Sequence, residues 1–310
     1  FDAHINIGLL TSKTERNERN NILKNLINNK INILIGTHSL FQEKIKYNKL
    51  GLIIIDEQHK FGVKQRKKLS DKGGKNCDVL VMSATPIPRT MMMTIYGDMD
   101  ISLIKTKPKN RKPIKTYSKN ELKINEVIKF INKEIINKNQ VFWVCPLINE
   151  SKKIDHQSAV KKYQTLSKIF KDRVDIIHGA MTKDQKDLVL KKFSEKKIDI
   201  LVSTTVIEVG IDFPNANVIV IENANKYGLT QLHQLRGRVG RGEREATCIL
   251  IFKSNLSKNA RKRISILKNS NDGFKIAEED LKIRGYGDIL GFKQSGIKKY
   301  NLADPMQHKD

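Results

Sequence analysis

Two adjacent carboxylates follow a run of four apolar residues in the first part of the chain. The run, Leu52–Ile55, is predicted to be a buried parallel strand, because such strands are apolar on both faces. Asp56 and Glu57 follow it directly, at the carboxyl end of the strand, where open α/β sheets bind their ligands. Asp56 could hold a hydrated Mg²⁺, and Glu57 could orient or deprotonate a water that attacks a γ-phosphate. Gln58 and His59 could report the nucleotide state to the rest of the protein. For the acidic pair alone, a charged turn after a strand is the favoured interpretation, and the motifs below reverse that balance.

Small hydroxyl residues follow the next predicted strand, residues 79–82. Ser83 and Thr85 could hydrogen-bond metal-binding carboxylates, while Pro86 and Pro88 stop the strand and begin a helix. The spacing between the two strand ends predicts neighbouring strands of one doubly wound sheet.

A glycine turn with small donors ends an earlier predicted strand, residues 31–35. Gly36, Thr37 and His38 could bind the phosphates of a nucleic acid strand through N–H and hydroxyl groups. An ordinary strand-to-helix turn is the favoured interpretation of this stretch taken alone.

Three arginines alternate with three glycines between residues 236 and 242. Glycine lets the backbone approach a ligand closely, and arginine offers planar donors to phosphate oxygens. In an NTPase, such arginines stabilise the γ-phosphate in the transition state. A generic phosphate or RNA patch is the alternative, and it is disfavoured because the stretch follows a complete second series of strands and helices.

The elements that must position these groups form two such series. Residues 105–119 are charged, contain proline and are poor in apolar residues, which makes them the best candidate for a linker. After it, strands alternate with helices, which predicts a second parallel sheet with right-handed crossovers. Strands are expected at residues 141–145, 174–177, 198–202, 218–221 and 248–252, with helices at 122–136 and 159–170 and a helix capped by Thr182.

Composition limits the classes that fit. The 310 residues are 39% hydrophobic and 29% charged, which is typical of a globular protein, and no apolar run could span a bilayer. A net charge of +25 favours a polyanionic partner, most simply nucleic acid, although lysine-rich compositional drift also contributes. Of the three cysteines, Cys145 and Cys248 are predicted to be core residues, a reduced and cytoplasmic pattern. The chain starts with Phe, not Met, which predicts that it is a fragment.

Taken together, these motifs resemble the motor of superfamily 2 helicases, and within it most closely the RecG family of bacterial branched-DNA helicases. The resemblance covers nearly the whole chain. Residues 56–59 resemble motif II, 83–85 motif III, 203–212 motif V and 234–241 motif VI, and 36–38 resemble the DNA-contacting motif Ic. Residues 270–291 resemble a helical hairpin and loop that, in this family, couples ATP turnover to stepping on duplex DNA.

The resemblance implies an α/β fold with two RecA-like domains on parallel sheets, the first incomplete, and a C-terminal helical hairpin with a loop. The expected boundaries are residues 1–108 for the first domain, 109–118 for the linker, 119–255 for the second domain and 256–310 for the translocation segment, incomplete at its end.

The resemblance also implies roles for single residues. ATP with Mg²⁺ would be held by Asp56, Gln58, His59, Gly210, Asp212 and Gln234, with Asp56 on the metal. Catalysis would use Asp56, Glu57, Arg238 and Arg241. DNA would be contacted by Gly36, Thr37, His38, Thr204, Thr205, Arg263, Arg284 and Gln294.

The implied function is an ATP-dependent DNA helicase that remodels stalled replication forks and Holliday junctions in repair and recombination. The partners would be branched double-stranded DNA and a single-stranded-DNA-binding protein, and the protein would be a cytoplasmic monomer without membrane contact. No stretch fits the phosphate loop Gly-x-x-x-x-Gly-Lys-Ser/Thr, which in this family lies upstream together with a wedge domain. We therefore expect this chain alone not to hydrolyse ATP at a useful rate.

Two alternatives stay open from the residues. One is the similar motor of the transcription-repair coupling translocase, whose partner would be RNA polymerase. The other is a nucleic-acid-binding remnant without catalysis. The direction of DNA remodelling and the preferred junction do not follow from these residues.

Overall fold

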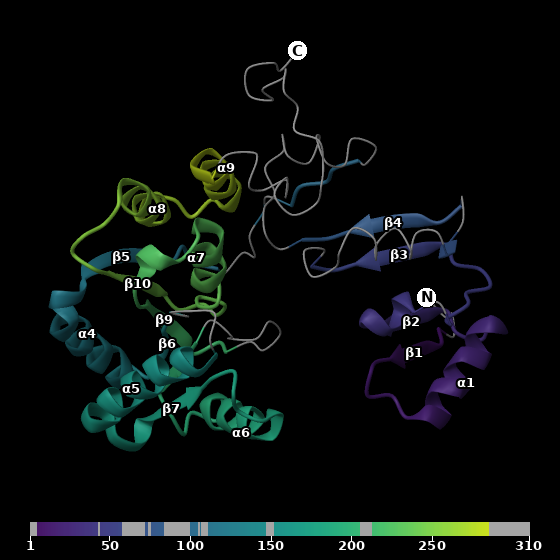
Figure 1. Ribbon diagram of the computed structural model, residues 1–310, viewed down its shortest axis with the longest axis horizontal. Helices are drawn as coiled ribbons and strands as arrows, with labels where there is room; N and C mark the ends of the chain where they lie inside the picture. The colour runs from purple at the N-terminus through teal and green to yellow at the C-terminus, as the bar shows by residue number, and fades with distance from the viewer. Residues whose placement is uncertain are drawn as a thin grey trace, which may run out of the picture. The chain divides into compact units, whose positions relative to one another are not determined.

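The computed structural model describes residues 5–42, 44–57, 72–73, 76–83, 100–104, 106, 111–146, 152–204 and 213–284. The chain divides into two compact units, residues 1–84 and residues 85–310. Figure 1 shows the elements of both, and each unit is described here by itself.

The first unit is built from two pairs of parallel strands. β1 pairs with β2 and β3 pairs with β4, so that Ile55 lies opposite Val81 at the end of the second pair. The predicted neighbouring strands before Asp56 and Ser83 are therefore confirmed. The elements are β1 (Ile7–Leu10), α1 (Arg16–Ile27), β2 (Ile33–Gly36), the 3-10 helix η1 (His38–Phe41), β3 (Leu52–Ile55) and β4 (Asp78–Val81).

The strands of this unit alternate between an exposed face and a face that is buried in β1 and β3 and partly buried in β2 and β4. In β3, Ile53 and Ile55 are buried, whereas Leu52 is 53% exposed and Ile54 57%. The prediction that all of Leu52–Ile55 is buried is therefore wrong for two of its four residues. Among the described residues, apolar side chains such as Tyr47 pack against one face of this strand pair and leave the other bare.

The second unit contains a six-stranded parallel sheet in the order β5-β10-β9-β6-β8-β7. Strands β6, β8 and β9 bury every residue, because a parallel sheet is covered by helices on both faces. The strands are β5 (Lys115–Asn120), β6 (Gln140–Val144), β7 (Val174–Ile177), β8 (Ile200–Ser203), β9 (Ala216–Ile221) and β10 (Thr247–Phe252).

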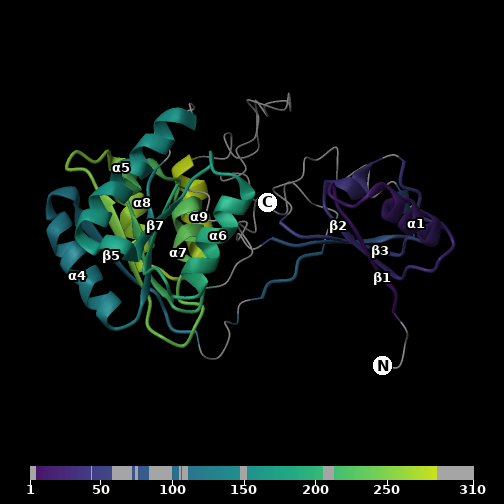
Figure 2. The same cartoon turned by 90° about the horizontal axis from the view of Figure 1, so that it is seen from below.

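Two apolar clusters lie on the two faces of this sheet, and Figure 2 shows the helices on either side. Phe142 and Val144 of β6 point to one face, while Val141 and Trp143 point to the other. This alternation is the geometry of a strand buried on both sides. The first face is covered by α6 (Lys183–Ser194), α7 (Leu229–Arg236) and α8 (Lys258–Asn269), and the second by α4 (Ile124–Ile136) and α5 (Lys152–Phe170).

The edge strand β5 was not predicted from the sequence. Its residues are mostly polar, and Thr116 is buried while Tyr117 is 47% exposed. Residues 115–118 of the expected linker thus belong to the sheet, because their backbone pairs with β10. The domain boundaries themselves stay predictions.

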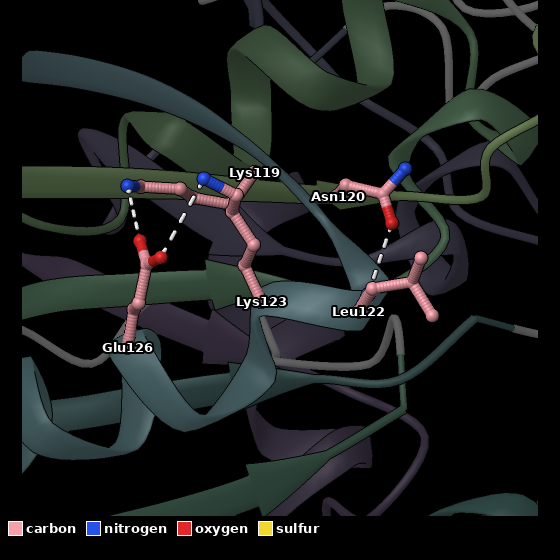
Figure 3. Close-up of polar contacts among 5 residues, drawn as sticks. All are labelled: Lys119, Asn120, Leu122, Lys123 and Glu126. Atoms are coloured by element: carbon pink, nitrogen blue, oxygen red, sulfur yellow. Dashed lines mark hydrogen bonds and ion pairs between the residues drawn. The ribbon is translucent and has the colours of Figure 1, made fainter.

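The connection from β5 to α4 is fixed by short polar contacts (Figure 3). The side chain of Asn120 accepts a hydrogen bond from the backbone N–H of Leu122 at 2.9 Å. Glu126 forms ion pairs with Lys119 at 2.8 Å and Lys123 at 3.6 Å. The cap satisfies a helix-terminal donor, whereas the exposed ion pairs contribute little to stability.

Two further helix features match the sequence. Thr182 and Gln185 form a capping box at the start of α6, which confirms Thr182 as its cap. At the other end of the chain, α8 and α9 (Gly273–Arg284) pack against each other and against α7 (Figure 1), as expected for a helical hairpin. No helix in the described part of the chain combines the length and apolar character needed to cross a membrane.

Candidate functional site

The carboxyl edge of the β3–β4 pair brings together two of the predicted motifs. The backbone N–H of Met82 donates to the carbonyl of Ile55 at 2.8 Å, which continues the pairing past both strands. Asp56 and Ser83 therefore follow neighbouring strand ends. In this arrangement a hydroxyl side chain can donate a hydrogen bond to a metal-binding carboxylate.

The backbone at the acidic pair has an unusual conformation. Glu57 has a φ of 50°, in the left-handed region that non-glycine residues seldom adopt. Its N–H donates to the Oδ1 atom of Asp56 at 2.8 Å. Asp56 is exposed at this edge, so its carboxylate fits a hydrated Mg²⁺ that takes its other ligands from water and phosphate. In the described part of the chain no three His, Cys, Asp or Glu side chains gather as a metal cluster.

The turn after β2 holds the first predicted DNA-contacting residues. A Cβ atom added to Gly36 would lie 2.3 Å from the carbonyl oxygen of Leu10, so only glycine fits here. The buried hydroxyl of Ser39 donates to the same carbonyl at 2.7 Å and ties η1 to β1. Thr37 and His38 are exposed on this fixed turn, where a ligand can reach them.

In the second unit, α7 and the loop after it carry the predicted arginines. Gln234 and Arg241 are exposed and Arg238 is half-buried. The loop turns at Gly240, whose φ is 69°, and a Cβ atom there would approach Ala246 to 2.9 Å. The alternation of glycine and arginine is thus explained in part by close packing at Gly240.

Arg236, the first arginine of this stretch, is a structural residue that the sequence did not single out. It is 2% exposed, and its Nη1 atom donates to the carbonyls of Leu267 at 2.7 Å and Ser270 at 2.8 Å. These carbonyls end α8, where a cation is favoured by the helix dipole. Burial lowers the pKa of Arg236 from its usual value. At the other end of α7, the hydroxyl of Thr230 donates to Asp280 of α9 at 2.6 Å, so polar contacts at both ends of α7 join it to the hairpin.

Two other predicted DNA-contacting residues lie inside the second unit. Thr204 follows β8 and is 3% exposed. Arg263 of α8 is half-buried, and its Nη2 atom donates to the carbonyl of Asn225 at 3.1 Å. This contact holds α8 against the segment after β9, so the structure gives Arg263 an intramolecular partner.

Several predicted site residues lie outside the described residues. They are Gln58, His59, Thr205, Gly210, Asp212 and Gln294, and Arg284 is described only as the last residue of α9. The predicted site residues that the structure describes thus fall in both units.

Comparison with protein families matches three segments of the chain. Residues 2–94 match the DEAD/DEAH box helicase family, and residues 122–243 match the helicase conserved C-terminal domain. Residues 270–304 match the C-terminal part of domain 3 of the ATP-dependent DNA helicase RecG. The last match favours RecG over the coupling translocase, and the three together confirm the α/β RecA-like helicase fold.

Curated relatives and solved structures agree with these matches. The chain is 46% identical to the ATP-dependent DNA helicase RecG of Bacillus subtilis, over 97% of this chain and 44% of that protein. It is 48% identical to RecG of Thermotoga maritima, over 97% of this chain and 39% of that protein. A structure of RecG bound to a three-way DNA junction superposes with a TM-score of 0.73 at 44% identity, over 98% of this chain and 39% of that one. The helicase Dbp5 of S. cerevisiae, at 18% identity and a TM-score of 0.59 over 91% of this chain and 75% of its own, shares the fold. The chain thus spans less than half the length of these RecG proteins, and over that length it belongs to the RecG family of helicases.

Proposed function

We propose that this chain is the motor portion of an ATP-dependent DNA helicase that remodels branched DNA in repair and recombination. The observation that carries the proposal is the pairing of β3 with β4, which sets Asp56 and Ser83 at one sheet edge within a chain of RecG sequence. The junction-bound RecG structure supports branched DNA as the substrate.

The chemistry follows from the residue types. A Mg²⁺ ion held at Asp56 would neutralise phosphate charge when ATP is bound. Glu57 would position the attacking water, and its backbone N–H, which donates to Oδ1 of Asp56, holds the Asp56 carboxylate. Arg238 and Arg241 would stabilise the charge that develops on the γ-phosphate, with Gln234 contacting the nucleotide.

DNA contacts would be made through the backbone of the duplex. Thr37 and His38 of the first unit are exposed donors suited to phosphate oxygens, which carry no sequence information, and Thr205 of the second unit is a donor of the same type. Thr204 is 3% exposed, so we do not propose it as a contact. Phosphate contacts suit a motor that must act at any sequence, and the net charge of +25 supports a polyanionic partner. The resemblance adds three expectations: a single-stranded-DNA-binding protein as a partner, a monomeric state and a cytoplasmic location.

The test is ATP turnover and strand separation by the protein at its full natural length. A three-way junction and a linear duplex of equal length are compared, beside a Glu57→Gln variant. We expect the junction to stimulate turnover and to be separated by the wild type, while the variant binds the junction and does neither. Equal stimulation by both DNAs would contradict branched DNA as the substrate. Junction-dependent turnover that survives in the variant would contradict the role of Glu57.

A further inference from the structure

Arg111, in the segment before β5, hydrogen-bonds to residues 237–242, the loop after α7 that is here called the arginine loop. The guanidinium of Arg111 donates from Nε to the carbonyl of Gly240 at 3.2 Å and from Nη2 to the carbonyl of Gly237 at 3.5 Å. These two glycines flank Arg238, and Gly240 precedes Arg241. Arg111 is 126 residues from Gly237 along the chain, so the contact joins distant segments within the second unit.

Packing at the same place supplies a second, independent link. A Cβ atom on Gly240 would lie 3.3 Å from the Cγ1 atom of Ile114, and Ile114 is only 9% exposed. The N–H of Lys115 donates to the carbonyl of Ala246 at 2.9 Å, on the far side of the loop. Residues 111–115 therefore run along the arginine loop and hold it by hydrogen bonds, apolar contact and strand pairing.

Arginine is suited to this contact in a way that lysine is not. Its planar fork presents two N–H groups in a fixed geometry, so one side chain can fix two carbonyls relative to each other. A lysine ammonium can donate to one of these carbonyls, but it does not fix the distance between the two. Gly237 precedes Arg238 and Gly240 precedes Arg241, so bonds to their carbonyls restrain the backbone next to both arginines.

We propose that Arg111 is a positioning residue that fixes the arginine loop, so that Arg238 and Arg241 are held ready for the nucleotide. It acts through the loop backbone and touches no reacting atom. The expected effect of Arg111 on ATP turnover rests on the proposed function, whereas its expected effect on the loop backbone does not. Residues 111–115 would thereby support the nucleotide-binding arginines in addition to connecting the chain to β5.

The test compares Arg111→Met and Arg111→Lys with Arg244→Met. Arg244 is a matched control, because it is also an arginine of the second unit that donates to backbone carbonyls, those of Asn137 and Lys138, away from the arginine loop. The first readout is hydrogen exchange at the amides of Arg238 and Val239, which donate to carbonyls of Leu235 and Arg236. The second is kcat and KM for ATP in the protein at its full natural length.

We expect exchange at these two amides to be at least about tenfold faster in Arg111→Met, intermediate in Arg111→Lys and unchanged in Arg244→Met. We expect kcat to fall about tenfold or more in Arg111→Met with KM changed less than about twofold, because the arginines act in the transition state. A loop that exchanges at the wild-type rate in Arg111→Met would overturn the proposal. So would equal losses of kcat in Arg111→Met and Arg244→Met. Absence of ATP turnover in the wild type would refute the proposed function, and amide exchange would still decide whether Arg111 fixes the loop.

Discussion

The two units use similar strands in different surroundings. In β6 of the second unit, Val141, Phe142 and Trp143 are each at most 1% exposed. In β3 of the first unit, Leu52 and Ile54 are more than half exposed, although the sequence of the strand is just as apolar. An apolar run thus predicts a strand that can be buried on both faces. Whether both faces are buried depends on the elements that pack against the strand.

The two units also differ in the polar contacts that they bury. The second unit buries the charged group of Arg236 among the carbonyls that end α8. In the described part of the first unit, the corresponding buried contact is the neutral hydrogen bond from Ser39 to Leu10. We therefore expect the second unit to resist unfolding more strongly, and three comparisons test this expectation.

The largest expected contrast is in the reactivity of the thiols. Cys77 of the first unit is partly exposed, whereas Cys145 and Cys248 of the second are buried. Burial raises the pKa of Cys248 to about 12 and that of Cys145 well above its usual value, so little thiolate is present at pH 8. We expect alkylation of Cys77 to be at least about a thousandfold faster, since the buried thiols must wait for unfolding.

The pH dependence of this reaction has a definite sign. Partial burial, and next the neighbouring carboxylate of Asp78, raise the pKa of Cys77. Because the thiolate is the reactive form, its labelling rate should still be rising at a pH where an ordinary thiol has levelled off. Mass spectrometry of the labelled peptides measures all three rates, and comparable rates for Cys77 and Cys248 at pH 8 would contradict the difference between the units.

Truncating one isoleucine in each unit gives the next largest contrast. Ile219→Ala removes a fully buried side chain of β9, and we expect a loss of about 2–5 kcal/mol in the free energy of unfolding. Ile54→Ala removes a mostly exposed side chain of β3, and we expect a change within about 0.5 kcal/mol.

Each unit carries its own reporter for this measurement. Trp143, the single tryptophan, is buried in the second unit, so its fluorescence in urea follows that unit. Labelling of Cys77 in urea follows the first. Equal losses in the two variants would mean that Ile54 is as well covered as Ile219.

The smallest expected contrast concerns the two buried polar contacts. Arg236→Met leaves the carbonyls of Leu267 and Ser270 without this donor, and we expect a loss of about 3 kcal/mol from the second unit. Ser39→Ala leaves one carbonyl without this donor, and we expect a loss of about 1 kcal/mol from the first. The same two reporters measure both variants. If Arg236→Met lost less free energy of unfolding than Ser39→Ala, the buried guanidinium would not stabilise its unit.

Much of the fold followed from local patterns in the sequence. The strands before Asp56 and Ser83, and the helix capped by Thr182, were predictable because apolar runs and caps act over a few residues. The strand β5 was missed, since its polar residues become a strand only through pairing with the distant β10. The half-buried state of β3 was missed for the same kind of reason: burial depends on what covers a strand.

The candidate site was predictable to a similar extent. Asp56 and Glu57 alone indicate only a charged turn, and they point to phosphate chemistry once the arginines around Arg241 are seen further along the chain. The roles of Arg111 and Arg236 could not be predicted, because their partners are backbone carbonyls, and any residue supplies a carbonyl. A lone arginine near a proline-containing segment gives no signal of the loop that it holds.

The proposed function requires both Glu57 and Arg241 for ATP turnover. A double-mutant cycle with Glu57→Gln and Arg241→Lys tests this, with kcat for ATP measured in the protein at its full natural length and in the presence of junction DNA. We expect kcat to fall about a hundredfold or more in each single variant. We expect kcat of the double variant to be about that of the slower single variant, because the effects of substituting residues that act as a unit are not additive. Losses that multiply in the double variant would mean that the two residues act independently, and would contradict their joint action in one catalytic step.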